Sequence, residues 1–127
     1  MKRFHLRLTP AGWGFNLKAP NGEIIATSEV YTSRPNCLLG IESVRRNALS
    51  HVEDQTREEC ETLTYPKYQV YQDKAGEFRF RLCAKNGEII AVSEGYTSKQ
   101  NCLLGIESVK RNAPEAPITE PDGTPVC

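Results

Sequence analysis

Two stretches of this chain occur twice: Asn21-Gly-Glu-Ile-Ile-Ala26 returns as Asn86-Gly-Glu-Ile-Ile-Ala91, and Cys37-Leu-Leu-Gly-Ile-Glu-Ser-Val44 returns as Cys102-Leu-Leu-Gly-Ile-Glu-Ser-Val109. Both recurrences are offset by 65 residues, and residues 21–48 and 86–113 are identical at 23 of 28 positions. Self-similarity at a fixed offset indicates a duplicated structural unit. The 127 residues therefore predict two copies of one unit rather than one irregular domain.

Each copy begins with apolar residues that alternate with polar ones, which predicts half-buried strands. In the first copy Phe4 and Leu6 lie on such a strand, a second strand follows over residues 13–19, and a third over residues 24–28. Phe4 and Leu6 match Tyr68 and Val70 only if the first hairpin loop is one residue shorter in copy one. The Asn-Gly pairs predict two-residue hairpin turns in which both central residues have positive φ.

A helix follows the third strand in each copy. Ser33 and Ser98 stand at the expected N-cap positions, and the helices are predicted to run to about Asn47 and Asn112. The first helix carries an apolar stripe formed by Cys37, Leu38, Ile41, Val44 and Ala48. Each copy is therefore a β-β-β-α unit.

A unit of this length seldom forms an independent core, so the two copies are predicted to pack together as a pseudo-two-fold dimer. The polar, acidic stretch 50–66 joins them, with a short strand near residues 51–53 and a matching stretch at 116–120. The predicted organisation is a first repeat at 1–54, a linker at 55–66, a second repeat at 67–120 and a tail at 121–127. The tail contains Pro and Gly and is expected to fray.

The motifs NGEIIA (86–91), SEGYTSK (93–99), NCLLGIESVKRNAP (101–114) and YQDKAGEFRFRL (71–82) together resemble the YegP-like proteins, small bacterial proteins of unknown function. The resemblance covers about residues 2–53 and 66–120. Copy one departs from copy two at Val30 and Pro35, where copy two has Gly95 and Gln100, and in its shorter first turn.

This resemblance implies an α+β fold of two tandem β(3)-α-β repeats. The repeats would form one continuous antiparallel sheet with two helices on one face and with the C-terminal strands exchanged between repeats. Family members would occur as single units that dimerise or as tandem units. The resemblance implies no activity, catalytic residue or cofactor.

Composition excludes several classes of protein. Sixteen Lys and Arg balance sixteen Asp and Glu, so the net charge is zero. The composition therefore does not point to nucleic acid or an acidic membrane as the partner. No apolar run approaches the roughly 18 residues of a membrane helix, and no signal peptide is recognisable, which predicts a cytoplasmic protein without a membrane partner. The five cysteines are odd in number and lack metal-ligand spacing, so neither a disulfide framework nor zinc is expected.

Three pairs of residues recur in both copies and are candidates for a functional role. Cys37 and Cys102 lie in the first turn of their helices, where a thiol pKa can fall, but on the apolar stripe where cysteine is a small buried hydrophobe. The mid-helix glycines 40 and 105 indicate close packing or, alternatively, a ligand near the bare backbone. Glu29 and Glu94 are interpreted as cross-strand partners of arginines rather than as acid-base groups.

The outward face of the strands is rich in cations. Residues predicted to point away from the helices are Arg3, His5, Arg7, Asn16, Lys18, Lys67, Gln69, Arg79, Arg81, Cys83 and Lys85. The anion-binding candidates among them are Arg3, Arg7, Lys18, Arg79, Arg81 and Lys85. Sheets that bind single-stranded nucleic acid usually expose aromatic residues for base stacking, and Tyr71 is the one candidate here. The alternative is a solvated face neutralised by Glu23, Glu29, Glu77, Glu88 and Glu94.

The sequence contains no catalytic constellation, so the main hypothesis is a non-enzymatic binding or interaction module with two pseudo-equivalent surfaces. It predicts an unidentified protein partner, no cofactor, no metal, and a monomeric pseudo-dimer or weak homodimer. One alternative is a nucleic-acid or other anion binder that uses the basic sheet face. The other is a thiol-dependent enzyme or redox protein that uses Cys37 and Cys102.

Overall fold

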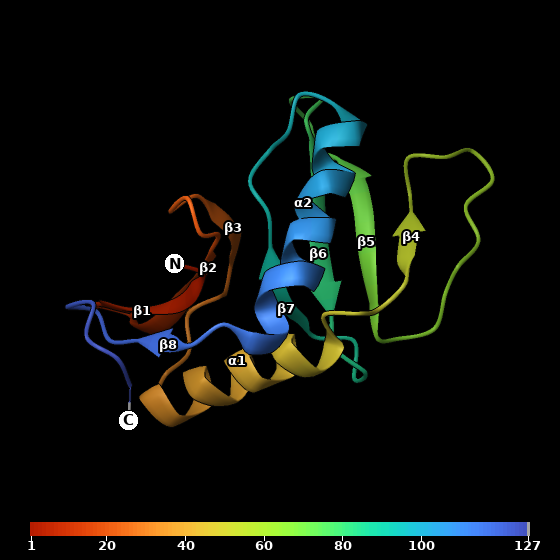
Figure 1. The fold of residues 1–127 in the computed structure, drawn as a ribbon. Coiled ribbons are helices and arrows are strands. Elements are labelled where there is room, and N and C mark those ends of the chain that lie inside the picture. The colour runs from red at the N-terminus through yellow and green to blue at the C-terminus, as the bar shows by residue number, and fades with distance from the viewer. Residues whose placement is uncertain (127) are drawn as a thin grey trace.

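The structure, a computed structural model, describes residues 1–126 and consists of one eight-stranded sheet with two helices (Figure 1). The strand order is β4-β5-β6-β7-β3-β2-β1-β8. The strands are β1 (Arg3–Thr9), β2 (Gly12–Lys18), β3 (Ile24–Thr27), β4 (Val52–Asp54), β5 (Lys67–Gln72), β6 (Phe78–Cys83), β7 (Ile89–Val92) and β8 (Ile118–Thr119). The two α-helices are α1 (Arg34–Asn47) and α2 (Lys99–Asn112), and a short 3-10 helix, η1 (Ala113–Glu115), follows α2. The predicted α+β fold of two tandem repeats is confirmed.

Both helices begin where the sequence predicts. The hydroxyl of Ser33 accepts a hydrogen bond from the backbone N–H of Asn36, and Ser98 does the same for Asn101. Each serine thereby satisfies one of the amide groups that a helix start leaves without a partner. The helices end at Asn47 and Asn112, as predicted.

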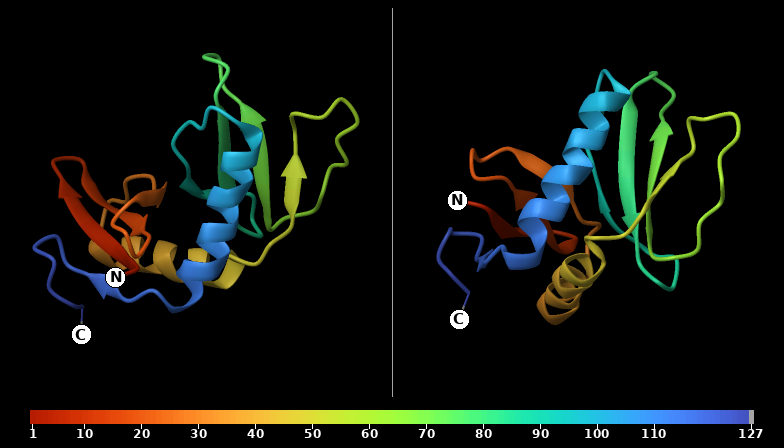
Figure 2. Two further views of the ribbon diagram at one scale, coloured as in Figure 1. Left: turned by 45° about the horizontal axis from the view of Figure 1, so that its top comes forward. Right: turned by 45° about the vertical axis from the view of Figure 1, so that its right-hand side comes forward.

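The two repeats meet at the centre of the sheet. Thr27 of β3 pairs antiparallel with Val92 of β7, and these residues are separated by 65 positions, the offset of the sequence repeat. When equivalent residues of two antiparallel strands pair with each other, a two-fold axis passes between them. The axis relating the repeats therefore lies at this pair, and the two halves of the sheet turn away from it on either side (Figure 2).

The C-terminal strand of each repeat joins the other repeat. Strand β4 follows α1 but pairs with β5, where Val52 lies opposite Tyr68. Strand β8 follows α2 but pairs with β1, where Ile118 lies opposite Phe4. The exchange that the resemblance implied is thus present.

The expected all-antiparallel sheet needs one correction, because the exchanged strands pair in parallel and the sheet is mixed. The six strands from β5 to β1 alternate in direction, so β5 and β1 run in opposite directions. Strand β4 follows the direction of β5, and β8 follows the direction of β1, so each exchanged strand runs opposite to the first strand of its own repeat. The inner six strands are antiparallel, as predicted.

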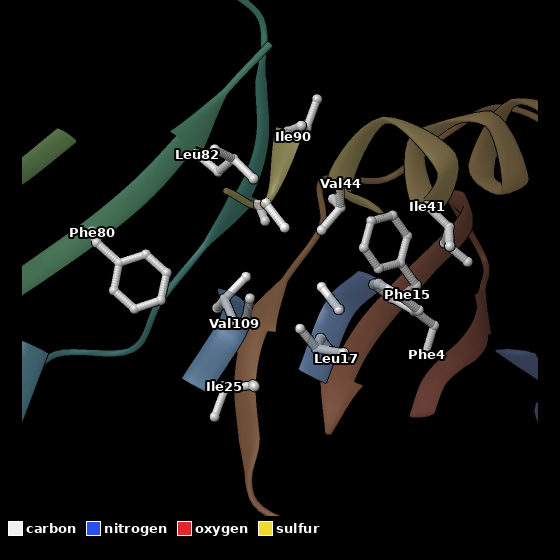
Figure 3. Close-up of a cluster of buried hydrophobic side chains, with 14 of the residues drawn as sticks. Phe4, Phe15, Leu17, Ile25, Ile41, Val44, Phe80, Leu82, Ile90 and Val109 are labelled. Atoms are coloured by element: carbon white, nitrogen blue, oxygen red, sulfur yellow. The ribbon is translucent and has the colours of Figure 1, made fainter. Parts of the chain in front are cut away.

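Both repeats contribute to one hydrophobic core. Helix α1 packs against β2 and also against β6 and β7 of the second repeat, while α2 packs against β6 and also against β3 of the first. Figure 3 shows side chains of both repeats in one cluster, with Val44 of α1 near Leu82 and Ile90, and Val109 of α2 near Ile25. The predicted inward residues Phe4, Leu6, Phe15, Leu17, Phe80 and Leu82 are fully buried, whereas Trp13 and Phe78 are only partly buried.

The Asn-Gly turns differ from the prediction. The prediction requires positive φ at both the asparagine and the glycine of each pair. Gly22 and Gly87 have φ near +88°, but among residues 1–126 only glycines have positive φ, so Asn21 and Asn86 have negative φ. The N–H of Ala19 bonds to the carbonyl of Glu23, and Ala19 accepts from the N–H of Gly22, which closes a three-residue loop. Pro20 has a φ that suits the first position of such a loop, so the chain adopts a type I turn followed by a left-handed glycine.

Replacing Gly87 by valine should destabilise the fold by about 1–2 kcal/mol, because a β-branched residue resists the left-handed conformation. A Cβ at Gly87 would meet only the ring of Tyr65 at ordinary contact distance, so crowding does not contribute. Urea denaturation monitored by circular dichroism measures the change. Lys74→Val in the exposed β5–β6 loop, where φ is not positive, is the matched control. Equal stability of the two variants would contradict the assigned turn.

The tail was expected to fray, but its described part folds back onto β8. The N–H of Val126 bonds to the carbonyl of Ile118, and the N–H of Glu120 bonds to Thr124. A turn at residues 121–124 closes this small hairpin, which contains the positive-φ Gly123. Cys127 lies outside the described residues.

Candidate functional site

A cleft lies between helix α1 of the first repeat and the β6–β7 turn of the second. Its volume is about 560 Å³, which is within the range of small-molecule and peptide pockets. One wall is a face of α1 together with the tyrosine that precedes it: Tyr31, Asn36, Leu39, Gly40, Ser43, Arg46 and Asn47. The other wall comes from the second repeat and the linker: Pro66, Ala84, Lys85, Asn86, Glu88 and Ile90. We call it the α1 cleft.

A second cleft, of about 490 Å³, lies between helix α2 and the β2–β3 turn of the first repeat. Its helix wall consists of Tyr96, Asn101, Leu104, Gly105, Ser108, Arg111 and Asn112, and its turn wall of Ala19, Pro20, Asn21, Glu23 and Ile25. We call it the α2 cleft. Because each cleft uses the helix of one repeat and the turn of the other, neither exists in a single unit.

The two clefts are equivalent under the 65-residue offset. Apart from Pro66, every residue that lines the α1 cleft has its counterpart in the α2 cleft. Eleven of these twelve pairs are identical, and the exception is Lys85, which corresponds to Pro20. The five differences between residues 21–48 and 86–113 fall at 27, 30, 34, 35 and 45 and their counterparts, and none of these lines a cleft.

The mid-helix glycines form the floor of the clefts. A Cβ on Gly40 would collide with the hydroxyl end of Tyr31, and one on Gly105 would meet Tyr96 and Phe80. Close packing therefore explains both glycines. In each repeat the packing partner is the tyrosine that precedes the same helix, Tyr31 or Tyr96, and its phenol ring lies against the helix backbone at the glycine.

Both cleft tyrosines keep their protons at neutral pH. Burial raises the pKa of Tyr31, and the nearby Cys37, Glu29 and Glu88 raise it further. Burial likewise raises the pKa of Tyr96, with contributions from Cys102, Glu94 and Glu23. Each phenol is therefore a hydrogen-bond donor, and each is close enough to a carboxylate of the opposite wall to sense its charge.

The thiols in the first turn of each helix are not activated. Cys37 and Cys102 are fully buried, and burial raises the pKa of each thiol to about 11. The effect of burial exceeds any benefit from the helix N-terminus. At neutral pH both groups are protonated and act as small apolar side chains.

Among Cys37, Cys60 and Cys102, we expect iodoacetamide at pH 7.5 to alkylate Cys60 first in the native protein and to leave Cys37 and Cys102 unmodified until the fold opens. Cys60 lies half exposed in the linker, whereas the other two are fully buried. Mass mapping of tryptic peptides over time measures the order, with urea-unfolded protein as the control. Rapid, pH-dependent modification of either helix cysteine would revive the thiol hypothesis.

Most of the predicted basic-face arginines have partners within the protein. Arg79 donates to the carboxylate of Asp73 at 2.7 Å, and Arg81 donates to Gln69 at 2.6 Å and lies over the ring of Tyr71. Arg7 donates to the carbonyl of Ser28 and covers Gly14, and Arg3 donates to the carbonyl of Met1.

The predicted basic face is less open than expected. Lys67, Gln69 and Cys83 are buried: strand β4 pairs with β5 beside them, and the ammonium of Lys67 meets the carboxylate of Glu53 and the carbonyl of Leu63. Lys85 does not lie with Arg79 and Arg81 but in the α1 cleft. The alternation fails there because β6 has an irregularity after Leu82 and ends at Cys83.

One predicted pairing is wrong. Glu29 and Glu94 are exposed, and none of the ion pairs among residues 1–126 includes them. The arginines expected to meet them turn elsewhere: Arg7 to the carbonyl of Ser28, and Arg79 to Asp73 and the carbonyl of Ser93. Loop carboxylates and backbone carbonyls are nearer to these guanidinium groups.

The clefts themselves were not predicted. A signal was present: exposed residues such as Leu39, Leu104, Arg46 and Arg111 are repeated without change, although they belong to no apolar core stripe. Strand exchange and the relative position of the repeats decide that these helix faces meet the turns of the opposite repeat. A pattern within one unit does not contain that information.

Within residues 1–126, no helix is long and apolar enough to cross a membrane. The same described part of the chain contains no group of three or more His, Cys, Asp or Glu arranged to hold a metal ion.

The exchanged β(3)-α-β repeats place the chain in the class of tandem-repeat α+β proteins. The chain belongs to the family defined by the domain of unknown function DUF1508, whose model matches residues 11–54 and 73–120, one match in each repeat.

Relatives occur in tandem and single forms. UPF0339 protein PA0329 of Pseudomonas aeruginosa is 39% identical over 119 residues, which cover 93% of this chain and 96% of that protein. A UPF0339 protein of Methanosarcina acetivorans is 60% identical over 52 residues, which are 41% of this chain but 90% of that relative, so the relative contains one unit. The solution structure of yegP from E. coli, a protein of unknown function, matches with a TM-score of 0.75 at 34% identity, covering 94% of this chain and 91% of the other.

Proposed function

We propose that this protein is a non-enzymatic binding module that holds ligands in the α1 and α2 clefts. The observation that carries the proposal is the near identity of the two clefts, which match at eleven of twelve equivalent positions. Drift since the duplication has changed five positions in the repeated segment, and all five lie outside the clefts.

The lining of the clefts suits binding. Each cleft offers an exposed leucine, with Leu39 66% and Leu104 55% accessible to solvent, beside asparagine, serine and charged side chains. Apolar surface with a few polar groups around it is typical of ligand sites. Neither cleft contains a histidine or an activated thiol, so recognition rather than turnover fits this chemistry.

The proposal is tested by titrating a library of small polar-aromatic fragments into ¹⁵N-labelled protein and following amide shifts by NMR. We expect fragments to shift amides that line both clefts. Leu39→Arg should remove the shifts in the α1 cleft only, and Leu104→Arg those in the α2 cleft only. Shifts confined to other surfaces, or no shifts at all, would refute the proposal.

Leu49→Arg is the matched control for these variants. Leu49 is 71% exposed just after α1 and lines neither cleft, so the substitution adds the same charge without entering a site. It should leave the fragment shifts unchanged in both clefts. Circular dichroism of all three variants checks that the fold is retained.

A second candidate is an anion or nucleic-acid site on the first half of the sheet. Burial lowers the pKa of His5, and the positive charges of Lys18 and Arg3 lower it further, which indicates a local positive potential. Fluorescence anisotropy with mixed RNA and DNA oligonucleotides tests this candidate, using wild type and Arg3→Glu/Lys18→Glu. Binding that weakens steeply with salt and disappears in the variant would support it, since phosphate contacts release counterions.

A further inference from the structure

The sheet opens between its two central strands. Strands β3 and β7 pair only through Thr27 and Val92, so among residues 1–126 no strand partner faces Ile89–Ala91 on the β3 side. The equivalent edge of β3 before Thr27 is also without a strand partner on the β7 side. Ile90 and Ile25, from these two strands, line the α1 and α2 clefts. Each cleft therefore lies between a helix and a strand that lacks a neighbour on that side.

We propose that each cleft binds an extended peptide segment that adds as a strand beside β7 or β3 and carries an acidic residue for Arg46 or Arg111. The inference rests on the proposed function and names its ligand class. A strand edge beside a helix supports recognition by strand addition, in which main-chain hydrogen bonds give affinity and side-chain contacts give specificity.

The length of the helix wall agrees with a short segment. The lining residues of α1 extend from Asn36 to Asn47, eleven residues apart, which is roughly 16 Å along a helix. An extended chain rises about 3.3 Å per residue, so the wall accommodates about five peptide residues. Leu39 supplies an apolar contact along it, and Asn36 supplies an amide that can bond to a peptide backbone.

Each cleft carries an arginine in its helix wall and one glutamate, Glu88 or Glu23, in its turn wall, so an acidic residue is favoured only on the helix side. None of the ion pairs among residues 1–126 includes Arg46 or Arg111, although the adjacent Arg45 and Lys110 each pair with a glutamate of their own helix. Lys85 adds a second cation to the α1 cleft, where the α2 cleft has Pro20. The α1 cleft should therefore bind acidic segments more tightly.

The test selects peptides from a random dodecapeptide library displayed on phage, using the intact chain as bait. We expect enriched sequences with an acidic and a branched apolar residue. Bound peptide should shift the amides of Glu88–Ile90 and Glu23–Ile25 and slow their hydrogen exchange. Arg46→Glu should weaken binding at the α1 cleft about tenfold or more, since charge-assisted pairs are the strong ones. Arg57→Glu, an exposed linker site outside this cleft, should not.

Exchanging the one differing position sharpens the test. Lys85→Pro should reduce the affinity of the α1 cleft for acidic peptides to that of the α2 cleft, and Pro20→Lys should raise the latter. Peptides that bind elsewhere, or a library that yields none while fragments still occupy the clefts, would overturn this inference and leave the proposed function standing. Failure of both peptides and fragments would overturn both.

Discussion

Glu53→Gln should destabilise the protein by about 3–5 kcal/mol, which is typical when one partner of a buried ion pair is removed. Glu53 and Lys67 are each only 4% exposed in their side chains, and Nζ lies 2.6 Å from the carboxylate. The carboxylate also accepts hydrogen bonds from Gln55 and from the backbone N–H of Leu63, so it joins β4, β5 and the linker. Urea denaturation at pH 7 measures the loss.

The same carboxylate should make stability depend on pH. Burial alone would raise the pKa of Glu53, but hydrogen bonds from Lys67, Gln55 and Leu63 outweigh it and lower the pKa from 4.5 to about 2. A group whose pKa is depressed by folding stabilises the fold above its unfolded pKa. That contribution is fully present above about pH 4.5 and is lost as the pH falls toward 2. The difference in stability between wild type and Glu53→Gln should therefore shrink over this interval.

The double variant Glu53→Met/Lys67→Met is the control. Replacing both charges by apolar groups of similar volume leaves no unpaired ion, so part of the stability lost in the single variant should return, the remainder being the bonds to Gln55 and Leu63. If the single variant unfolds at the same urea concentration as wild type, or if its stability has the same dependence on pH, the pair does not hold the linker in place.

Local structure was predictable because it depends on short patterns. The N-cap serines, the alternation of Phe4 and Leu6 and the apolar stripe around Ile41 each report on neighbours within a few residues. The predicted correspondence of Phe4 with Tyr68, which required a first hairpin loop one residue shorter in copy one, is confirmed. Phe4 pairs with Leu17 and Tyr68 pairs with Leu82, and these two leucines are 65 residues apart. These signals are local, and burial in the fold reinforces them.

The burial of Lys67, Gln69 and Cys83 could not be predicted, because it depends on contacts between residues far apart in the sequence. Lys67 resembles a surface lysine by alternation alone, and only the pairing of the exchanged strand β4 with β5 places Glu53 beside it. The same limit applies to Lys85, which an irregularity in β6 moves from the sheet face to the α1 cleft. The clefts require the exchange of β4 and β8, a property of two units together.

Separating the repeats should abolish the folded monomer. If residues 1–56 and 57–127 are expressed as independent chains, each half loses the partner of its own C-terminal strand. It also exposes core residues that the other repeat covers, since α1 packs on β7 and α2 packs on β3. Bonds across the repeats are lost as well, including Tyr68 to the carbonyl of Ala48 at 2.7 Å, Lys99 to Asp54 at 2.9 Å and Arg34 to Glu120 at 2.7 Å. Each half should be unfolded or dimeric by light scattering and circular dichroism.

Dimerisation has a specific form, because β1 and β5 are equivalent edges. In a dimer of residues 57–127, β8 should pair with β5 of the second copy, as it pairs with β1 in the intact chain. Mixing the two halves should restore a one-to-one complex in which β4 again pairs with β5. Its amide spectrum should match that of the intact protein away from the cut. A half that folds as a monomer would show that each unit buries its own core. That result would contradict the conclusion that both repeats are needed to form each cleft.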